Sequence, residues 1–164
     1  MIDGYLKKGV ELPDESIHLL YSANRWEKRE EIERHLAQGT NVLCDRYAYS
    51  GVAFSMAKGM ERSWCQRPDE GLPRPDLLLF LHLSPEAAAS RPGFGEERYE
   101  VSAFQLQVRE AYARLEKEEA HSIPWTFVDA ERSIDEVFLD MKRAILSTVE
   151  SAHGPTKPLW REDQ

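Results

Sequence analysis

The stretch NVLCDRYAYSGVAF, residues 41–54, decides the fold, because it predicts a strand, a polar turn and a helix in succession. Residues 41–44 predict a short buried strand, and Ser50-Gly51 opens the next helix. The turn between them is the tripeptide Asp45-Arg46-Tyr47. In an open parallel sheet, ligands bind just beyond the carboxyl ends of the strands. The tripeptide therefore occupies the place at which such a sheet binds its ligand.

The tripeptide has two interpretations. An acid, a guanidinium and an aromatic ring in succession suit a phosphate ligand with its metal, since Asp45 can hold hydrated Mg²⁺ and the fork of Arg46 can grip phosphoryl oxygens. The alternative is a strand that ends in a surface ion pair. Taken alone, the tripeptide favours the ion pair, because Asp-Arg pairs beyond strand ends are common.

Length and composition predict one soluble domain. The chain has 164 residues, no internal repeat and no low-complexity tract. No apolar run reaches membrane length and MIDGYLKKG at 1–9 lacks the hydrophobic region of a signal peptide, so we expect no membrane partner and an intracellular protein. The net charge of −8 argues against a nucleic-acid partner. Cys44 and Cys65 have neither zinc-site nor disulfide spacing.

Outward from this stretch, expected helices and strands alternate. The run LLLFLHL at 77–83 is continuously apolar and predicts a strand buried on both faces, and 124–129 predicts a third strand. Turn residues predict a loop over 61–75. Helices are expected over 14–38, 50–58, from the cap signal Ser84-Pro85, over 102–120 and from the capping box Ser133–Glu136. This alternation predicts a three-layer α/β fold with a parallel sheet.

Two other segments offer binding side chains. Tyr21 and Arg25 are four residues apart on the first long helix, so that a stacked ring and a fork donor could together read a planar base. The alternatives are core packing for Tyr21 and a pair with a nearby Glu for Arg25, and the helix alone favours them. The Gly-containing segment 91–99 carries two arginines between helices. It fits either a loop that closes over a phosphate or a plain surface loop.

Four stretches together resemble the eukaryotic-type thymidylate kinases, which are nucleoside monophosphate kinases of the P-loop group. They are LLYSANRWE at 19–27, DRYAYSGVAF at 45–54, GLPRPDLLLFL at 71–81 and FGEERYE at 94–100. The resemblance covers nearly the whole chain in the family's order and spacing. It implies a P-loop-kinase-like domain over 1–152 with a lid at about 91–99. The two prolines of 153–164 predict a flexible, loosely held tail, whose Trp160 can dock on the body. It also implies transfer of a phosphoryl group from MgATP to dTMP.

The resemblance assigns roles to the residues that match. Tyr21 stands where an aromatic ring stacks on thymine, and Arg25 where an arginine binds the base O4. Asp45 matches the carboxylate near Mg²⁺, which it holds through water, and Arg46 matches the arginine that bridges the acceptor and donor phosphates. These matches reverse the preference for packing and ion pairs.

The remaining matches concern the pocket wall and the lid. Ser50 and Gly51 line the thymidylate pocket, Phe54 forms a wall, and Tyr99 lies beside the deoxyribose. On the ATP side, Arg91 falls where a lid arginine packs on adenine, Arg98 is a second lid arginine, and Gln105 resembles a residue that contacts the phosphate-binding loop. Pro92 stands where the family has glycine or another small residue.

One family feature is missing from these residues. The family begins with a strand and a glycine-rich P-loop ending in Gly-Lys-Ser/Thr, and no such sequence is present in the chain. We expect Met1 to be an internal methionine of a longer frame. We expect the absent strand to belong in the sheet centre, between 41–44 and 77–83. We also expect negligible kinase activity from this chain alone, since the P-loop supplies the main grip on the donor phosphates.

Three hypotheses follow. The first is a thymidylate kinase that lacks its amino terminus, with dTMP and ATP as partners, a homodimeric state and a cytoplasmic, nuclear or mitochondrial location. The second is a non-catalytic relative that binds nucleotide or pairs with a full-length kinase. The third, a hydrolase built around Ser50, has little support, because the chain has neither a Gly-x-Ser-x-Gly elbow nor clustered His ligands.

Overall fold

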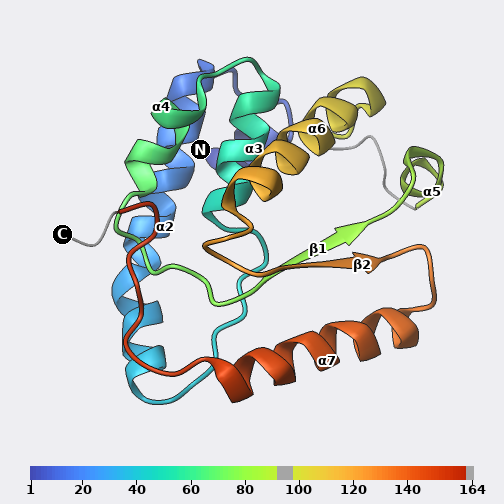
Figure 1. Cartoon of the computed structure of the whole chain (residues 1–164). Helices are drawn as coiled ribbons and strands as arrows, with labels where there is room; N and C mark the ends of the chain where they lie inside the picture. The colour runs from blue at the N-terminus through green and yellow to red at the C-terminus, as the bar shows by residue number, and fades with distance from the viewer. Residues whose placement is uncertain (92–97, 162–164) are drawn as a thin grey trace.

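Helices cover both faces of a small parallel sheet in the computed structural model, which describes residues 1–91 and 98–161. In Figure 1, α3 and α6 lie on one side of the sheet and α7 lies on the other. The three-layer α/β arrangement with a parallel sheet is as predicted. The elements are α1 (Ile2–Leu6), α2 (Asp14–Ala37), α3 (Ala48–Ala57), α4 (Arg62–Gln66), η1 (Arg67–Asp69), β1 (Leu78–His82), α5 (Pro85–Ala89), α6 (Ser102–Glu119), β2 (Trp125–Asp129) and α7 (Ile134–Ser151).

Local capping explains where several helices begin. The hydroxyl of Ser84 accepts a hydrogen bond from the backbone N–H of Ala87, and Ser133 with Glu136 forms the predicted capping box. The predicted loop over 61–75 is partly wrong, because it contains α4 and η1. Glu61 caps α4 by accepting hydrogen bonds from the N–H groups of the second and third residues after it.

The two strands run parallel. Leu78 pairs with Trp125 at one end and His82 with Asp129 at the other. The prediction that β1 is buried on both faces is wrong, since Leu81 is 43% exposed. A strand is buried on both faces only when both faces are fully covered, and here the covering is partial.

The predicted strand over 41–44 is absent. These residues have no strand hydrogen bonds, and Leu43 is 76% exposed. An extended segment becomes a strand only when a neighbouring chain accepts and donates its backbone hydrogen bonds. Within the described residues no neighbour pairs with this segment, so its apolar side chains stay on the surface.

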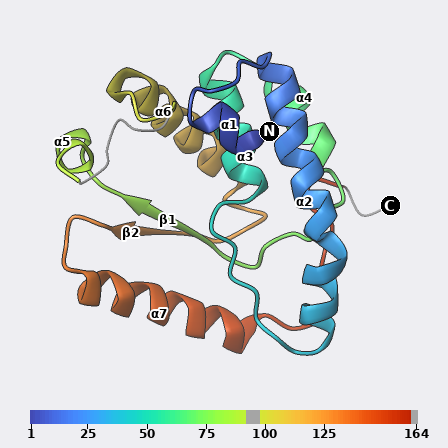
Figure 2. The ribbon, with the colours of Figure 1, turned by 180° about the vertical axis from the view of Figure 1, so that it is seen from behind.

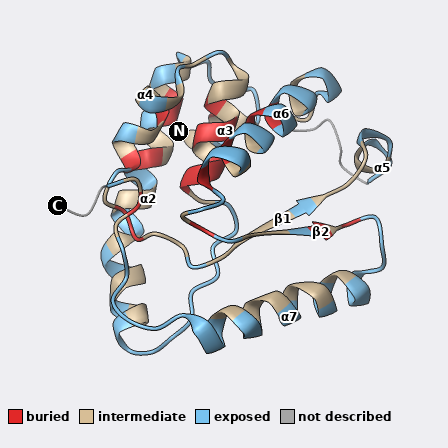
Figure 3. Cartoon of the chain, in the orientation of Figure 1, coloured by how far each residue is buried: buried red, intermediate tan, exposed pale blue. Residues whose placement is uncertain are grey.

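The core is centred on α3. Ala48, Val52 and Ala53 are fully buried, and Ala111 and Leu115 of α6 are buried in the same cluster. Figure 3 shows the buried residues concentrated on α3 and the segments around it. Small side chains let α3 and α6 approach closely, because alanine adds little bulk between helix axes. Within the described ranges, no helix combines the length and the apolar character needed to cross a membrane.

The segment after α7 returns to the body. Leu159 is fully buried and exchanges two backbone hydrogen bonds with residues 71–72, through its oxygen and its N–H. The indole of Trp160 donates to Glu119 over 2.9 Å, as expected from a docking tryptophan. The tail was predicted to be loosely held over 153–164, and the part around Leu159 is packed instead.

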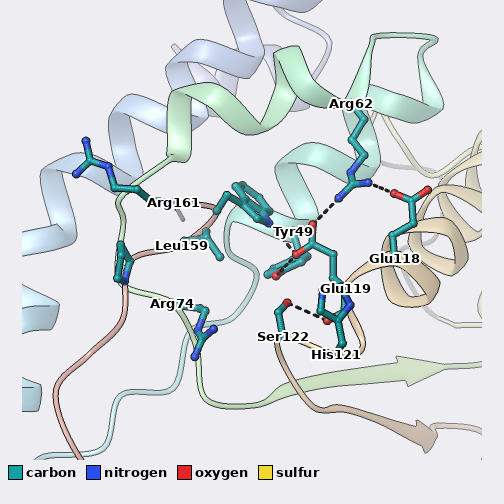
Figure 4. Close-up of a pocket in the computed structure, with 11 residues that line it drawn as sticks. Tyr49, Arg62, Arg74, Glu118, Glu119, His121, Ser122, Leu159 and Arg161 are labelled. Carbon is teal, nitrogen blue, oxygen red and sulfur yellow. Dashed lines mark hydrogen bonds and ion pairs between the residues drawn. The ribbon is translucent and has the colours of Figure 1, made fainter. Parts of the chain in front are cut away.

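Glu119 holds this end of the molecule together. The residue is only 6% exposed and lies beside a cavity of about 300 Å³ (Figure 4). Its carboxylate receives hydrogen bonds from four side chains on three other segments. The donors are Tyr49 at 2.9 Å, Arg62 at 2.7 Å, Gln66 at 2.8 Å and Trp160 at 2.9 Å. A buried carboxylate needs such donors to offset its lost hydration.

Replacing Glu119 by Ala is expected to lower the free energy of unfolding by about 3 kcal/mol, because Arg62 would lose the more buried of its two carboxylate partners and the buried donors of Tyr49 and Trp160 would lose their acceptor. Urea denaturation followed by tryptophan fluorescence measures the change. The matched control is Glu118→Ala, which removes a half-exposed carboxylate and is expected to cost less than about 1 kcal/mol. Equal losses in the two variants would contradict the role of Glu119 as the central acceptor.

Candidate functional site

A cavity of about 260 Å³ is lined mainly by residues of α2, of α3 and of the segment between them, together with Leu6 of α1 and Tyr99. Figure 2 shows α1 lying in front of α3 and beside α2. Eight of the predicted site residues line the cavity, although they come from three separate stretches of sequence. They are Tyr21, Arg25, Asp45, Arg46, Ser50, Gly51, Phe54 and Tyr99.

Arg46 is held in an unusual backbone conformation. Its φ is +64°, a left-handed value that costs energy for a residue with a side chain. The conformation directs its Nε to the hydroxyl of Ser50 at 3.1 Å and places the guanidinium 4.5 Å from the ring centre of Phe54. No described residue accepts from its terminal Nη atoms, which leaves two donor groups for an anion beside the cavity.

Ser50 links this arginine to α6. Its hydroxyl lies 2.8 Å from the hydroxyl of Tyr112, whose pKa is raised by burial. Ser50 lies in the first turn of α3, as predicted for a residue that opens this helix. The hydrogen-bonded series Arg46–Ser50–Tyr112 therefore orients the guanidinium from behind.

Asp45 is exposed at the rim of the cavity. Among the described residues there is no group of three His, Cys, Asp or Glu side chains that could hold a metal ion. Mg²⁺ keeps several of its waters and is commonly held by one or two carboxylates together with substrate phosphates. A single exposed carboxylate beside Arg46 fits that mode of binding, with Asp45 as the residue that would hold the hydrated ion.

Arg25 forms an ion pair with Asp69, whereas its position on the helix had suggested a pair with a nearby Glu. Its Nε and Nη2 donate to the two oxygens of Asp69 at 3.0 and 2.6 Å, and not to a nearby Glu. The guanidinium also lies against Gly51, where an added Cβ would be 3.0 Å from the nearest nitrogen. A side chain at 51 would therefore require the guanidinium to move by a few tenths of an ångström. Tyr21, one turn before Arg25 on α2, lines the same cavity.

Tyr99 belongs to an aromatic cluster at the other end of the cavity. Its ring stacks on Phe104 at a centroid distance of 5.4 Å and meets the edge of Phe54 at 5.2 Å. Its hydroxyl lies 3.4 Å from that of Tyr5, and burial raises the pKa of Tyr99 to about 12. The phenol is thus neutral, and the ring forms a fixed apolar wall.

Two titratable residues that line this cavity, Lys58 and His18, are not marked by any motif in the sequence. Lys58 donates to Asp14 at 2.7 Å and lies 5.0 Å from the ring centre of Tyr99. Burial alone would lower the pKa of Lys58, but the hydrogen bond to Asp14 and the neighbouring phenols raise it, so the amine stays charged. His18 is fully buried beneath the cavity. No local signal marks either residue, because their partners lie far away in the sequence.

The predicted ATP-side residues do not line the cavity. Arg91 donates to the carbonyl of Ala130, beyond the end of β2. Arg98 forms a two-point pair with Glu11, at 2.6 and 3.1 Å. The amide of Gln105 donates to a backbone oxygen, that of Tyr99. Most of the predicted lid, including Pro92, lies outside the described residues.

A parallel α/β sheet with a cavity that combines arginines, aromatic rings and one exposed carboxylate is typical of enzymes that bind phosphorylated nucleotides. Comparison with known proteins agrees with this class. The family model for thymidylate kinase matches residues 1–141. The chain belongs to the thymidylate kinase family, whose members are ATP-dependent nucleoside monophosphate kinases.

Individual relatives match over most of the chain. The thymidylate kinase of Danio rerio is 46% identical over 165 residues, which cover 98% of this chain and 76% of that protein. The Arabidopsis thaliana protein of the same name is 44% identical, over 98% of this chain and 60% of its own length. The solved structure of thymidylate kinase from Candida albicans superposes with a TM-score of 0.82 at 33% identity, covering 96% of this chain and 79% of that one.

Acidification is expected to destabilise the protein through His18. Its Nδ1 faces the hydroxyl of Ser55 at 2.7 Å and its Nε2 the carbonyl of Cys65 at 2.9 Å, which accommodates the neutral ring with Nε2 as donor. Burial lowers the pKa of His18 from the ordinary value of 6.5. The unfolded chain therefore binds the proton more readily, and stability falls as pH drops through and below about 6.5.

Urea denaturation at about pH 7.5 and about pH 5.5 tests this expectation. The wild-type midpoint should fall more between the two conditions than that of His18→Gln, which has no titratable ring. His153→Gln, which changes an exposed histidine, serves as control and should follow the wild type. An identical pH response in wild type and His18→Gln would contradict the assignment.

Proposed function

We propose that this chain carries the acceptor-nucleotide site of a thymidylate kinase, which binds dTMP and directs its phosphate toward MgATP to form dTDP. The observation that carries the proposal is the convergence of eight residues from three stretches of sequence on one cavity. Family membership supplies the reaction class, and the cavity supplies the chemistry for a pyrimidine nucleotide.

The side chains are arranged in an order that suits such a ligand. Tyr21 offers a ring on which a base could stack, and Arg25 offers donors for a ring carbonyl. Arg46, with its free Nη atoms, is placed for the phosphate, and Asp45 beside it for the hydrated Mg²⁺. Tyr99 is the proposed neighbour of the sugar.

Arg46 is the proposed catalytic residue. Phosphoryl transfer is accelerated mainly by positioned positive charge that stabilises the oxygens of the transferring group. The left-handed backbone at Arg46, the hydrogen bond from its Nε to Ser50 and the contact with Phe54 all restrict its guanidinium before any ligand binds. A preorganised donor of this kind loses little entropy in the transition state.

The residues expected to bind ATP, the phosphate donor, do not form a complete site by themselves. The 164 residues contain no Gly-x-x-x-x-Gly-Lys-Ser/Thr segment, and we propose that Arg91, Arg98 and Gln105 act on the ATP side only together with one. We therefore expect the chain by itself to bind dTMP but to transfer phosphate negligibly. The exposed segment 41–44 favours a second possibility, in which a homodimeric or full-length kinase partner completes the sheet.

A coupled assay of ADP release with MgATP and dTMP tests the proposal. We expect turnover only in a version extended at its amino terminus by a strand and P-loop, and roughly a hundredfold lower kcat when that version carries Arg46→Gln. Arg34→Gln, which removes an exposed arginine of α2, should leave kcat unchanged. Turnover by the 164-residue chain alone would show that the P-loop is dispensable. Absence of dTMP binding in both versions would overturn the proposed function.

A further inference from the structure

Asp69 is the most deeply buried charged side chain near the candidate site. Its residue is 0% exposed, and it ends the short helix η1 next to α2. Both carboxylate oxygens are hydrogen-bonded to α2. One receives Nε of Arg25 at 3.0 Å and the hydroxyl of Ser22 at 2.7 Å, and the other receives Nη2 of Arg25 at 2.6 Å.

This two-point contact fixes the plane of the Arg25 guanidinium. A guanidinium that donates from two nitrogens to both oxygens of one carboxylate has a single preferred orientation. The side chain of Arg25 is 11% exposed, so little freedom remains. Asp69 therefore determines where the unused donors of Arg25 point.

The unused donors face the cavity. Nη1 of Arg25 has no acceptor among the described residues, and it would lie 3.1 Å from a Cβ added at Gly51. The guanidinium is thus held between Asp69 on one side and the bare backbone of α3 on the other. Arg25 and Tyr21 line the same cavity, so a base bound there could meet both side chains.

We propose that Asp69 is a positioning residue that sets the base specificity of this cavity. By holding Arg25, it presents only hydrogen-bond donors to the edge of the base. The thymine of dTMP offers the O4 acceptor at that edge, whereas the cytosine of dCMP offers the N4 amino donor. The fixed N–H donors of Arg25 can therefore hydrogen-bond O4 of thymine. Against cytosine they would face the N4 amino group, which is also a donor, so no hydrogen bond would form. This inference rests on the proposed function.

Stability alone does not account for a charged pair at this depth. Buried ion pairs often stabilise a fold no more than well-packed apolar side chains of similar volume. A buried pair that also ends in free donors within a cavity has a binding use. Asp69 thus acts on the ligand through Arg25 without contacting it.

Two variants disturb Arg25 from opposite sides. Asp69→Asn removes the charge and one acceptor while keeping the size of the side chain. Gly51→Ala places a methyl group against the guanidinium from the cavity side and leaves Asp69 intact. The matched control is Tyr49→Phe, which removes a hydrogen bond of 2.9 Å to the other buried carboxylate, Glu119, away from the cavity.

The measurement is the ratio of dissociation constants for dCMP and dTMP, obtained by titration calorimetry on the full chain. Loss of folded protein lowers the active fraction equally for both nucleotides and leaves this ratio unchanged. We expect the ratio to fall roughly tenfold in Asp69→Asn and Gly51→Ala, mainly through weaker dTMP binding, and to stay within about twofold of wild type in Tyr49→Phe.

A second readout follows Arg25 without any ligand. The Nε–H signal of Arg25 in a ¹H–¹⁵N spectrum should be sharp and protected from exchange in the wild type and in Tyr49→Phe, and broadened or lost in Asp69→Asn. Unchanged signals and an unchanged ratio in Asp69→Asn would overturn this inference while dTMP binding still supported the proposed function. A wild-type chain that binds neither nucleotide would overturn both the proposed function and the specificity role.

Discussion

A buried carboxylate has to receive hydrogen bonds from the chain around it, and this constraint sets how the helices of this protein meet. Asp69 receives them from Arg25 and Ser22, which ties η1 to α2 and forms one wall of the cavity. Glu119 receives them from the body and from Trp160, which holds the carboxyl-terminal segment in place. Because each acceptor joins segments distant in sequence, the two carboxylates organise the helical half of the molecule.

The region around α2, α3 and α6 is more completely buried than the region formed by the two-stranded sheet and α7. Around α3, the side chains of Val52 and Leu115 are fully buried. On the sheet side, Phe127 is 51% exposed and Ile134 of α7 is 87% exposed. The candidate dTMP site is lined mainly by α2, by α3 and by the segment between them, and no residue of β1 or β2 lines it.

Sequence motifs predicted the site residues that lie close together in the chain, but not the partners that folding brings to them. Arg46, Ser50 and Gly51 could be assigned because they lie within one short stretch that resembles a known family. The partner of Arg25 could not, since Asp69 lies 44 residues away in a segment that was predicted to be a loop. Lys58 was missed for the same reason, because its charge is stabilised by Asp14 from another helix.

The sequence by itself determined the long helices, the parallel α/β pattern and the residues that resemble a nucleotide site, because helix hydrogen bonds and caps join residues a few positions apart. Ser133 and Glu136 specify the start of α7 without help from the rest of the chain. Only the tertiary structure decided that residues 41–44 form no strand and that Arg25 pairs with Asp69. Strand pairing and buried ion pairs depend on partners brought together by folding, and no local pattern names those partners.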